Sequence, residues 1–329
     1  MAHLLPLLLP SFLQPLWLPY AETSSTYINA KFTHRGSLGD SHALWWPPRN
    51  GARPEQILLF VPGNPGLVDF YIPFLSAVYA NSSSAGIAIL AHGLLDHTPG
   101  IENAPSRYPA DDILTIQVET SIEILDTITN TYPGVRVVTV AHSLGTWINL
   151  RMMKARPGAI TSSFLLFPTL SNLANTPKGR LVWRLFSPLP RRILSSLAFL
   201  VDYIPDLVLA QLLPLWPEHQ RLVMRRFASS SSCVNASIAT AHAEMKEILD
   251  LDLESVEANR NRLWFYYGET DHWVGEEKTS FLKAFDPNGQ SAQILHGPSE
   301  VPHEFCINHS DLLAKDCIQW LEMVHIPKP

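Results

Sequence analysis

Short apolar runs alternate with longer amphipathic segments along most of the chain. The short runs are rich in β-branched and aromatic residues, as is typical of buried strands, and lie at residues 57–61, 86–91, 137–140, 163–167, 263–267 and 292–295. The longer segments repeat apolar residues at helical spacing and cover residues 70–80, 111–132, 146–154, 276–285 and 305–324. Strands that alternate with helices predict an α/β fold, with a mostly parallel sheet covered by helices on both faces.

This alternation is interrupted over residues 169–261, where no strand pattern is visible. A chain of 329 residues can bury one large core and still carry an inserted subdomain. The interruption therefore predicts a helical cap at residues 169–261, inserted into a core made of residues 51–168 and 262–329. Residues 1–50 are assigned to an apolar arm and lead-in.

The middle of the predicted cap, Ile193 to Trp216, is long and apolar enough to suggest a transmembrane helix. However, Asp202 and Asp206 lie near its centre beside Pro205, and a carboxylate at the centre of a span costs about 2.5–3.5 kcal/mol. The segment instead predicts two apolar helices, hinged at residues 203–206, that lie in a lipid interface.

Basic side chains just before this segment could meet anionic lipid headgroups; they are Arg180, Arg184, Arg191 and Arg192. Together these features predict contact with a membrane or a lipid droplet. The alternative is a cap whose apolar faces simply cover the active site, and the two roles are compatible.

The amino-terminal segment, residues 1–20, has no charged side chain and carries Pro6, Pro10, Pro15 and Pro19. A secretory signal peptide would need a basic start and an unbroken apolar helix, so secretion is the less favoured alternative. We expect a flexible apolar arm that touches a lipid surface or packs on the domain.

Composition narrows the possible functions. The chain is 46% hydrophobic and 16% charged, with a net charge of −6. The negative charge and the absence of basic runs argue against nucleic-acid binding. The three cysteines, Cys233, Cys306 and Cys317, form no CxxC pair, which favours a reducing compartment without a disulfide framework.

A candidate nucleophile lies between a predicted strand and a predicted helix, in the sequence Ala141-His142-Ser143-Leu144-Gly145. This is small-x-Ser-x-Gly, the pattern of a nucleophile elbow. The turn at the serine is so sharp that larger side chains two residues before and after it would collide. A chance match in an ordinary strand–helix turn is the alternative for this stretch taken alone.

A serine hydroxyl needs a histidine to take its proton and a carboxylate to orient that histidine. On this fold the chain order is serine, acid, histidine. Asp271 follows the predicted strand at residues 263–267, at a carboxyl-terminal strand end where such sites are built. Glu269 is a rival acid, and an Asp271 that only caps the following helix is the alternative to a catalytic one.

Three histidines follow the candidate acid. His303 lies in a predicted loop where it can reach over the edge of the sheet, so it is the favoured base. His296 ends a predicted strand and is the rival. His309 is expected inside the last helix.

The developing oxyanion requires two backbone N–H groups, one from the residue after the nucleophile and one from an early strand–loop junction. The first is that of Leu144. The second is assigned to Asn64, because Pro65 has no N–H and because Gly63 and Gly66 allow the backbone to approach closely. By itself this loop would be interpreted as a plain turn.

The stretches VPGNPGLVDFYIPFL, AHSLG, YYGETDHWV and VPHEF together resemble the lipid droplet-associated hydrolases, from about residue 56 to the end. Ala141 stands where that family usually has Gly. The resemblance implies an α/β-hydrolase fold, with Ser143 as nucleophile, Asp271 as acid and His303 as base. It also implies association with lipid droplets or the endoplasmic reticulum and a part in neutral-lipid storage, with sterol esters a suggested substrate.

The expected function is a serine hydrolase of the lipase or esterase type that cleaves a carboxylic ester of an apolar lipid, such as a sterol ester or an acylglycerol. It would act at the droplet surface or the endoplasmic reticulum, on the cytosolic side, without a metal or organic cofactor. The alternatives are an acyltransferase on the same residues and a droplet-binding tether with a vestigial site. Epoxide hydrolases and dehalogenases are disfavoured because they place Asp where Ser143 stands.

Overall fold

A single sheet runs through the molecule. The computed structural model describes residues 9–18, 26–36, 38–101, 103, 109, 112–274 and 277–325. In these residues nine strands follow the order β1-β2-β3-β5-β4-β6-β7-β8-β9. β1 pairs antiparallel with β2, β2 with β3, and β3 with β5, and the remaining pairs of the sheet are all parallel. The strands are β1 (Leu13–Pro15), β2 (Ile28–Thr33), β3 (Asp40–Trp46), β4 (Gln56–Val61), β5 (Ile87–His92), β6 (Arg136–His142), β7 (Ser162–Leu166), β8 (Leu263–Tyr267) and β9 (Ile294–His296).

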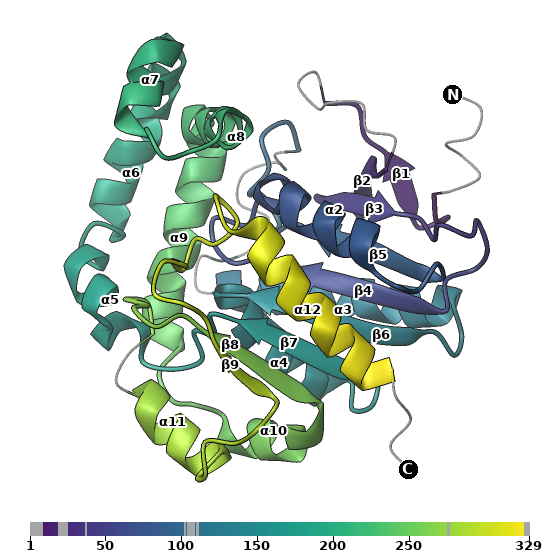
Figure 1. Ribbon diagram of the computed structural model, residues 1–329. Helices are drawn as coiled ribbons and strands as arrows, with labels where there is room; N and C mark the ends of the chain where they lie inside the picture. Colours follow the sequence, from purple (N-terminus) through teal and green to yellow (C-terminus); the bar gives the residue numbers. More distant parts are fainter. Residues whose placement is uncertain are drawn as a thin grey trace.

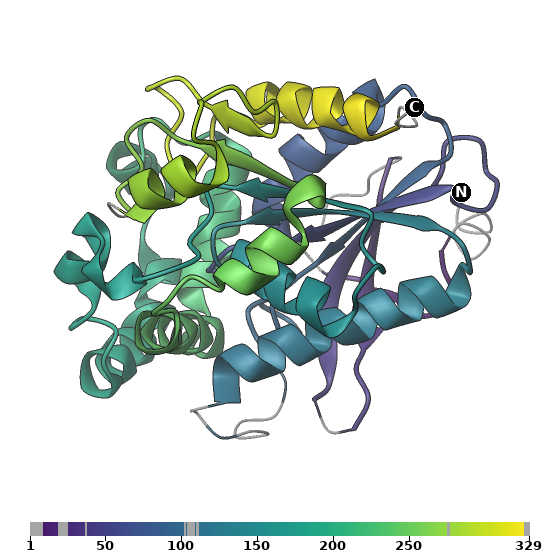
Figure 2. The same ribbon diagram turned by 90° about the horizontal axis from the view of Figure 1, so that it is seen from below.

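Helices cover both faces of this sheet. Figure 2 shows α2 and α12 on one face and α3 and α4 on the other. Because both faces are covered, the central strands β4 and β6 are buried almost throughout and appear in the sequence as continuous apolar runs. The predicted α/β fold is confirmed. The covering helices are η1 (Val68–Tyr71), α2 (Ile72–Asn81), α3 (Ile113–Thr131), α4 (Leu144–Ala155), α11 (Glu277–Phe285) and α12 (Ser310–His325).

The predicted boundary of the core at residue 51 is wrong, because β1, β2 and β3 belong to the sheet. Trp45 and Trp46 on β3 are almost fully buried, one on each face. Within the predicted arm, Leu13 is also buried and β1 pairs with β2, so this part of the arm packs on the domain. Trp17, further along the arm, is exposed. Residues 1–8 and 19–20 of the arm lie outside the described residues.

The last helix begins later than predicted. Residues 303–308 form turns, and α12 starts at Ser310, so the expectation that His309 lies inside the helix is wrong. The reason is local packing: Phe305 is fully buried among aromatic rings, stacked on Phe167 at 5.7 Å. This anchor holds the preceding loop over the end of the sheet.

Between β7 and β8 the chain is helical, and its helices α5 to α9 gather beyond one end of the sheet (Figure 1). Proline begins α5 and α6, where its missing N–H is not needed. Pro205 separates η4 from α7, as the predicted hinge requires. The elements are η3 (Leu173–Asn175), α5 (Pro177–Val182), α6 (Pro188–Leu197), η4 (Ala198–Tyr203), α7 (Asp206–Leu212), α8 (Glu218–Ser229), α9 (Ser231–Glu247), α10 (Leu253–Ala258) and η5 (Arg260–Arg262). Among the residues that the structure describes, no helix has both the length and the apolar character needed to cross a membrane.

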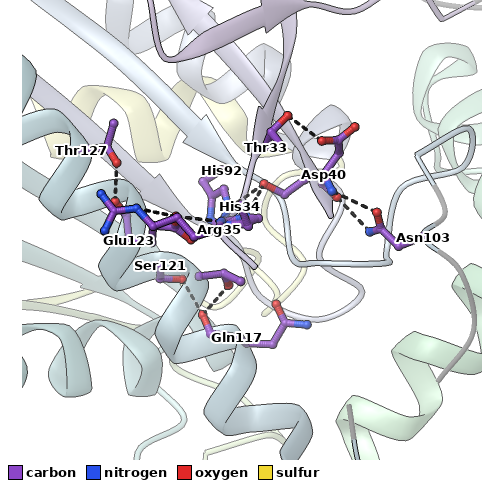
Figure 3. Close-up of polar contacts among 12 residues, drawn as sticks. Thr33, His34, Arg35, Asp40, His92, Asn103, Gln117, Ser121, Glu123 and Thr127 are labelled. Atoms are coloured by element: carbon purple, nitrogen blue, oxygen red, sulfur yellow. Dashed lines mark hydrogen bonds and ion pairs between the residues drawn. The ribbon is translucent and has the colours of Figure 1, made fainter. Parts of the chain in front are cut away.

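A buried polar chain joins the antiparallel strands to α3 (Figure 3). His34 Nδ1 lies 2.9 Å from a carboxylate oxygen of Glu123, and His34 Nε2 lies 2.9 Å from the hydroxyl of Ser41. The same hydroxyl lies 2.9 Å from His92 Nε2. Although this is an acid–histidine–serine series, Ser41 is only 2% exposed, so no substrate reaches it. The chain satisfies buried polar groups of β3, β5 and the turn after β2 next to α3.

We expect Trp45→Ala to lower the free energy of unfolding by about 3–5 kcal/mol, because it leaves a cavity in the core. Trp17→Ala is the matched control: the Trp17 side chain is 76% exposed, and its loss should change stability by no more than about 0.5 kcal/mol. Urea unfolding measures both. Equal effects would contradict the placement of β3 inside the core.

Candidate active site

Ser143 lies at the sharp turn between β6 and α4. Its φ is 51° and its ψ is −123°, a conformation that costs a residue with a side chain about 1–3 kcal/mol. A Cβ on Gly145 would collide with the carbonyl oxygen of Val61, and Ala141 is fully buried. The small residues of the elbow pattern are therefore required by close packing around the turn.

The structure brings the predicted serine, histidine and aspartate together. His303 Nε2 lies 2.9 Å from Ser143 Oγ, and His303 Nδ1 lies 2.8 Å from an Asp271 carboxylate oxygen. The other Asp271 oxygen accepts a hydrogen bond from the N–H of Trp273 at 2.8 Å. The three side chains come from the turn after β6, the loop after β8 and the loop after β9, at the carboxyl ends of the strands.

The electrostatics favour an ionised Asp271. Burial alone would raise the pKa of this carboxyl, but His303 and the Trp273 N–H outweigh the burial and lower the pKa. A carboxylate beside Nδ1 holds a proton there and leaves Nε2 free to accept one from the serine. The arrangement can therefore activate the Ser143 hydroxyl as a nucleophile.

The rival residues lie elsewhere. Glu269 is exposed in the loop after β8, and His296 is exposed at the end of β9, stacked on Tyr267. His309 lies just before α12. Among the described residues, no hydrogen bond joins any of these three to the serine.

His142 has a contact that the sequence did not indicate. Its Nδ1 lies 2.8 Å from the hydroxyl of Tyr71, and its Nε2 lies 3.0 Å from the backbone carbonyl of His303. Burial lowers the pKa of His142 to about 3, so the ring is neutral. It donates from Nε2 to the carbonyl and accepts from the tyrosine, and it thereby fixes the loop that carries His303. The elbow pattern allows any residue at this position and gives no signal for the contact.

The loop after β4, residues 62–66, approaches the serine closely. A Cβ on Gly63 would lie 2.7 Å from Ser143 Cβ, so only glycine permits this approach. In the described part of the chain, no hydrogen bond uses the backbone N–H of Asn64 or of Leu144. Their role as the donors of an oxyanion hole stays a prediction.

Cap helix α9 also reaches this loop. The Asn64 amide donates to the backbone carbonyl of Ser237 and to a carboxyl oxygen of Glu244, each at 3.0 Å. The Ser237 hydroxyl donates back to the Asn64 amide oxygen at 2.7 Å. Burial raises the pKa of Glu244 to about 8, although the bond from Asn64 opposes the rise. The sequence carries no motif for these contacts.

A cavity of about 400 Å³ opens above Ser143 and His303, between the core and the cap. Most of its wall is apolar, and the apolar residues include Phe70, Leu173, Phe186, Trp216, Met224 and Ile307. A cavity of this size and character suits an apolar organic substrate.

Comparison with known proteins places the chain in a family. Residues 54–306 match the family described as "Lipid-droplet associated hydrolase", which covers most of the chain. The chain belongs to the lipid droplet-associated hydrolase family. The resemblance seen in the sequence is thus confirmed. A lipid droplet-associated hydrolase of Gallus gallus is 27% identical over 281 residues, which are 82% of this chain and 85% of the relative. The lipid droplet-associated hydrolase of Homo sapiens is 26% identical over 277 residues, which are 80% of this chain and 83% of the relative.

Solved structures show the same α/β-hydrolase fold. An epoxide hydrolase from Vigna radiata superposes with a TM-score of 0.60, covering 92% of this chain and 100% of its own, at 13% identity. Such a likeness concerns the fold alone, because one fold carries many chemistries. The family and the fold together make this protein a hydrolase.

The buried Glu244 makes the stability of this hydrolase depend on pH. An unfolded glutamate titrates near 4.3, whereas the folded pKa is about 8. Between these values the folded state keeps a proton that the unfolded state releases, so stability falls as the pH rises. We expect Glu244→Gln to raise the Tm relative to wild type, and by more at pH 8 than at pH 5.

The control for this prediction is Glu119→Gln, at an exposed position of α3. Its Tm difference from wild type should be the same at both pH values. A Glu244→Gln difference that does not change with pH would contradict a protonated Glu244.

Proposed function

We propose that the protein is a serine hydrolase that cleaves a carboxylic ester of an apolar lipid, such as a sterol ester or an acylglycerol, at lipid droplets. One observation carries the proposal: His303 lies 2.9 Å from Ser143 Oγ and 2.8 Å from Asp271. Its place of action is the droplet or endoplasmic reticulum surface on the cytosolic side, and its role is in neutral-lipid storage. The names of the curated relatives support the droplet assignment.

In the first half of the reaction Ser143 Oγ attacks the acyl carbon while His303 Nε2 takes the hydroxyl proton. The carbonyl oxygen becomes an oxyanion, which accepts hydrogen bonds from the backbone N–H groups of Asn64 and Leu144. The bond to the alcohol oxygen then breaks, and His303 gives its proton to the departing alcohol. The product of this half is an acyl ester on Ser143.

In the second half a water molecule attacks the acyl-enzyme while His303 removes its proton. The second oxyanion collapses, the fatty acid leaves, and Ser143 regains its proton from His303. Asp271 stays ionised throughout and stabilises the imidazolium. Nucleophile, base and oxyanion donors all come from the chain, so this mechanism uses no metal or organic cofactor.

The exposed surface of the cap supports delivery of the substrate from a lipid phase. Apolar side chains of α6, η4 and α7 form what we term the apolar face: Leu189, Ile193, Leu197, Leu200, Leu207 and Leu212. Leu189 is 70% and Leu207 71% exposed, and a soluble protein rarely leaves such a large apolar patch facing water. Arg180, Arg184 and Arg192 are exposed in the same segment, as suits contact with an anionic phospholipid monolayer.

Labelling with a fluorophosphonate tests the reaction. We expect wild type to be labelled, Ser143→Ala to be unlabelled, and His303→Ala to react about 10²–10⁴-fold more slowly because the general base is lost. His296→Ala is the matched control and should react at the wild-type rate. Slow labelling of His296→Ala with normal labelling of His303→Ala would overturn the choice of base. Wild type that neither labels nor cleaves lipid esters would overturn the function.

Flotation with artificial droplets, made of a neutral-oil core and a monolayer containing anionic phospholipid, tests the surface. Leu189→Glu combined with Leu207→Glu should weaken binding at least about tenfold, because each buried leucine contributes about 1.5–3 kcal/mol. Met323→Glu, at a half-exposed site on α12, is the control and should bind normally. Release by Trp17→Glu in the arm, without release by the cap variant, would contradict contact through the apolar face.

A further inference from the structure

The loop after β4 is hydrogen-bonded to one side of α9 at two separate points. The α9 residues involved are Ser237, Thr240 and Glu244. Their spacing of three and four residues places them on one face of the helix. We call them the α9 polar stripe. No step of the ester hydrolysis uses any of them directly.

The first point of attachment is the Asn64 side chain. Its amide nitrogen donates both to the Ser237 carbonyl and to Glu244, and its oxygen accepts from the Ser237 hydroxyl. Glu244 is only 4% exposed, so water does not readily replace it as the acceptor. These three bonds hold the residue whose backbone N–H is assigned to the oxyanion.

The second point of attachment runs through His97. Its Nδ1 lies 2.7 Å from the Pro65 carbonyl, and its Nε2 lies 3.1 Å from the Thr240 hydroxyl. Because a carbonyl only accepts, Nδ1 carries the proton and Nε2 accepts from the threonine. Burial lowers the pKa of His97 to about 4, which is consistent with a neutral ring. A Cβ on Gly66 would lie 2.8 Å from Nδ1, so glycine is needed for this contact.

We propose that the α9 polar stripe positions the oxyanion loop, so that the cap supplies part of the geometry of the catalytic site. Ser237, Thr240 and Glu244 are positioning residues that act through Asn64 and Pro65. This inference rests on the proposed ester hydrolysis. It assigns to a cap helix the task of holding the Asn64 N–H where the oxyanion forms.

Positioning of this kind acts on kcat. The oxyanion exists in the transition state and in the tetrahedral intermediate but not in the bound ester, so a displaced donor slows the chemical step and leaves ground-state binding intact. Complete loss of one donor costs about 10²–10³ in kcat. A donor that is only displaced should cost roughly tenfold or more, within that upper limit.

The test measures kcat and KM with a soluble short-chain ester, so that droplet binding plays no part. Glu244→Leu removes the acceptor at similar volume and should lower kcat about tenfold or more, with KM within about threefold of wild type. Glu244→Gln keeps an acceptor oxygen and should restore most of that loss. Thr240→Val, which removes the second attachment, should also lower kcat. Glu247→Leu, at an exposed site of the same helix, is the control and should behave as wild type.

A comparison of single and double variants distinguishes a loss of positioning from a general defect in folding. If Glu244 acts through Asn64, adding Glu244→Leu to Asn64→Ala should cost little beyond Asn64→Ala alone. Unchanged kcat in Glu244→Leu, a change in KM alone, or full additivity with Asn64→Ala would each overturn the positioning role. If Ser143→Ala is as active as wild type, the proposed hydrolysis itself fails, and the inference falls with it for a distinguishable reason.

Discussion

The chain turns at Ser143 through a conformation, φ 51° and ψ −123°, that a side chain makes unfavourable. Packing on either side of the turn offsets the cost of this backbone conformation. β6 is buried in the middle of the sheet, and α4 is anchored by fully buried side chains. The same turn explains the glycines around it, because Gly63 and Gly145 are both sites where a Cβ would overlap neighbouring atoms. The turn places the Ser143 hydroxyl at the carboxyl end of the strands, next to the loops that follow the other parallel strands.

Neutral histidines join these loops into one unit. His142 links the elbow to the backbone of the His303 loop, and His97 links the Pro65 carbonyl to α9. Burial lowers the pKa of both rings, so each offers one donor and one acceptor, and its tautomer is fixed by its partners. His303 differs because its Nδ1 faces the Asp271 carboxylate and its Nε2 faces the Ser143 hydroxyl. His142 and His97 thus hold backbone segments in place, whereas His303 is the one of these three rings that joins a carboxylate to the Ser143 hydroxyl.

Local patterns in the sequence were enough to predict the parallel half of the sheet, because strands covered on both faces appear as unbroken apolar runs. Chain order, combined with position at a strand end or in a loop, was enough to favour Asp271 and His303 over their rivals, and the structure brings both beside Ser143. The antiparallel strands β2 and β3 were missed because their polar and apolar residues alternate irregularly, and because β3 joins the sheet by pairing with β5, which follows β4 in the chain. The contacts of Asn64 were missed for a related reason: its partners on α9 lie 173 and 180 residues away, and no periodicity reports such a separation.

The cap has two different surfaces. One is the apolar face, and the other is the α9 polar stripe, which contacts Asn64 and His97. The apolar face on α6, η4 and α7 is directed to the outside of the molecule, where Figure 1 shows α6 and α7 at the far side of α9 from the sheet. α6 packs against α9, and α9 is hydrogen-bonded directly to Asn64 and, through His97, to the Pro65 carbonyl. A displacement of α6 that carried α9 with it would therefore break hydrogen bonds at the loop after β4. Because separation of a buried hydrogen bond leaves its donor and acceptor unsatisfied, these bonds hold α9 in one position relative to the loop after β4.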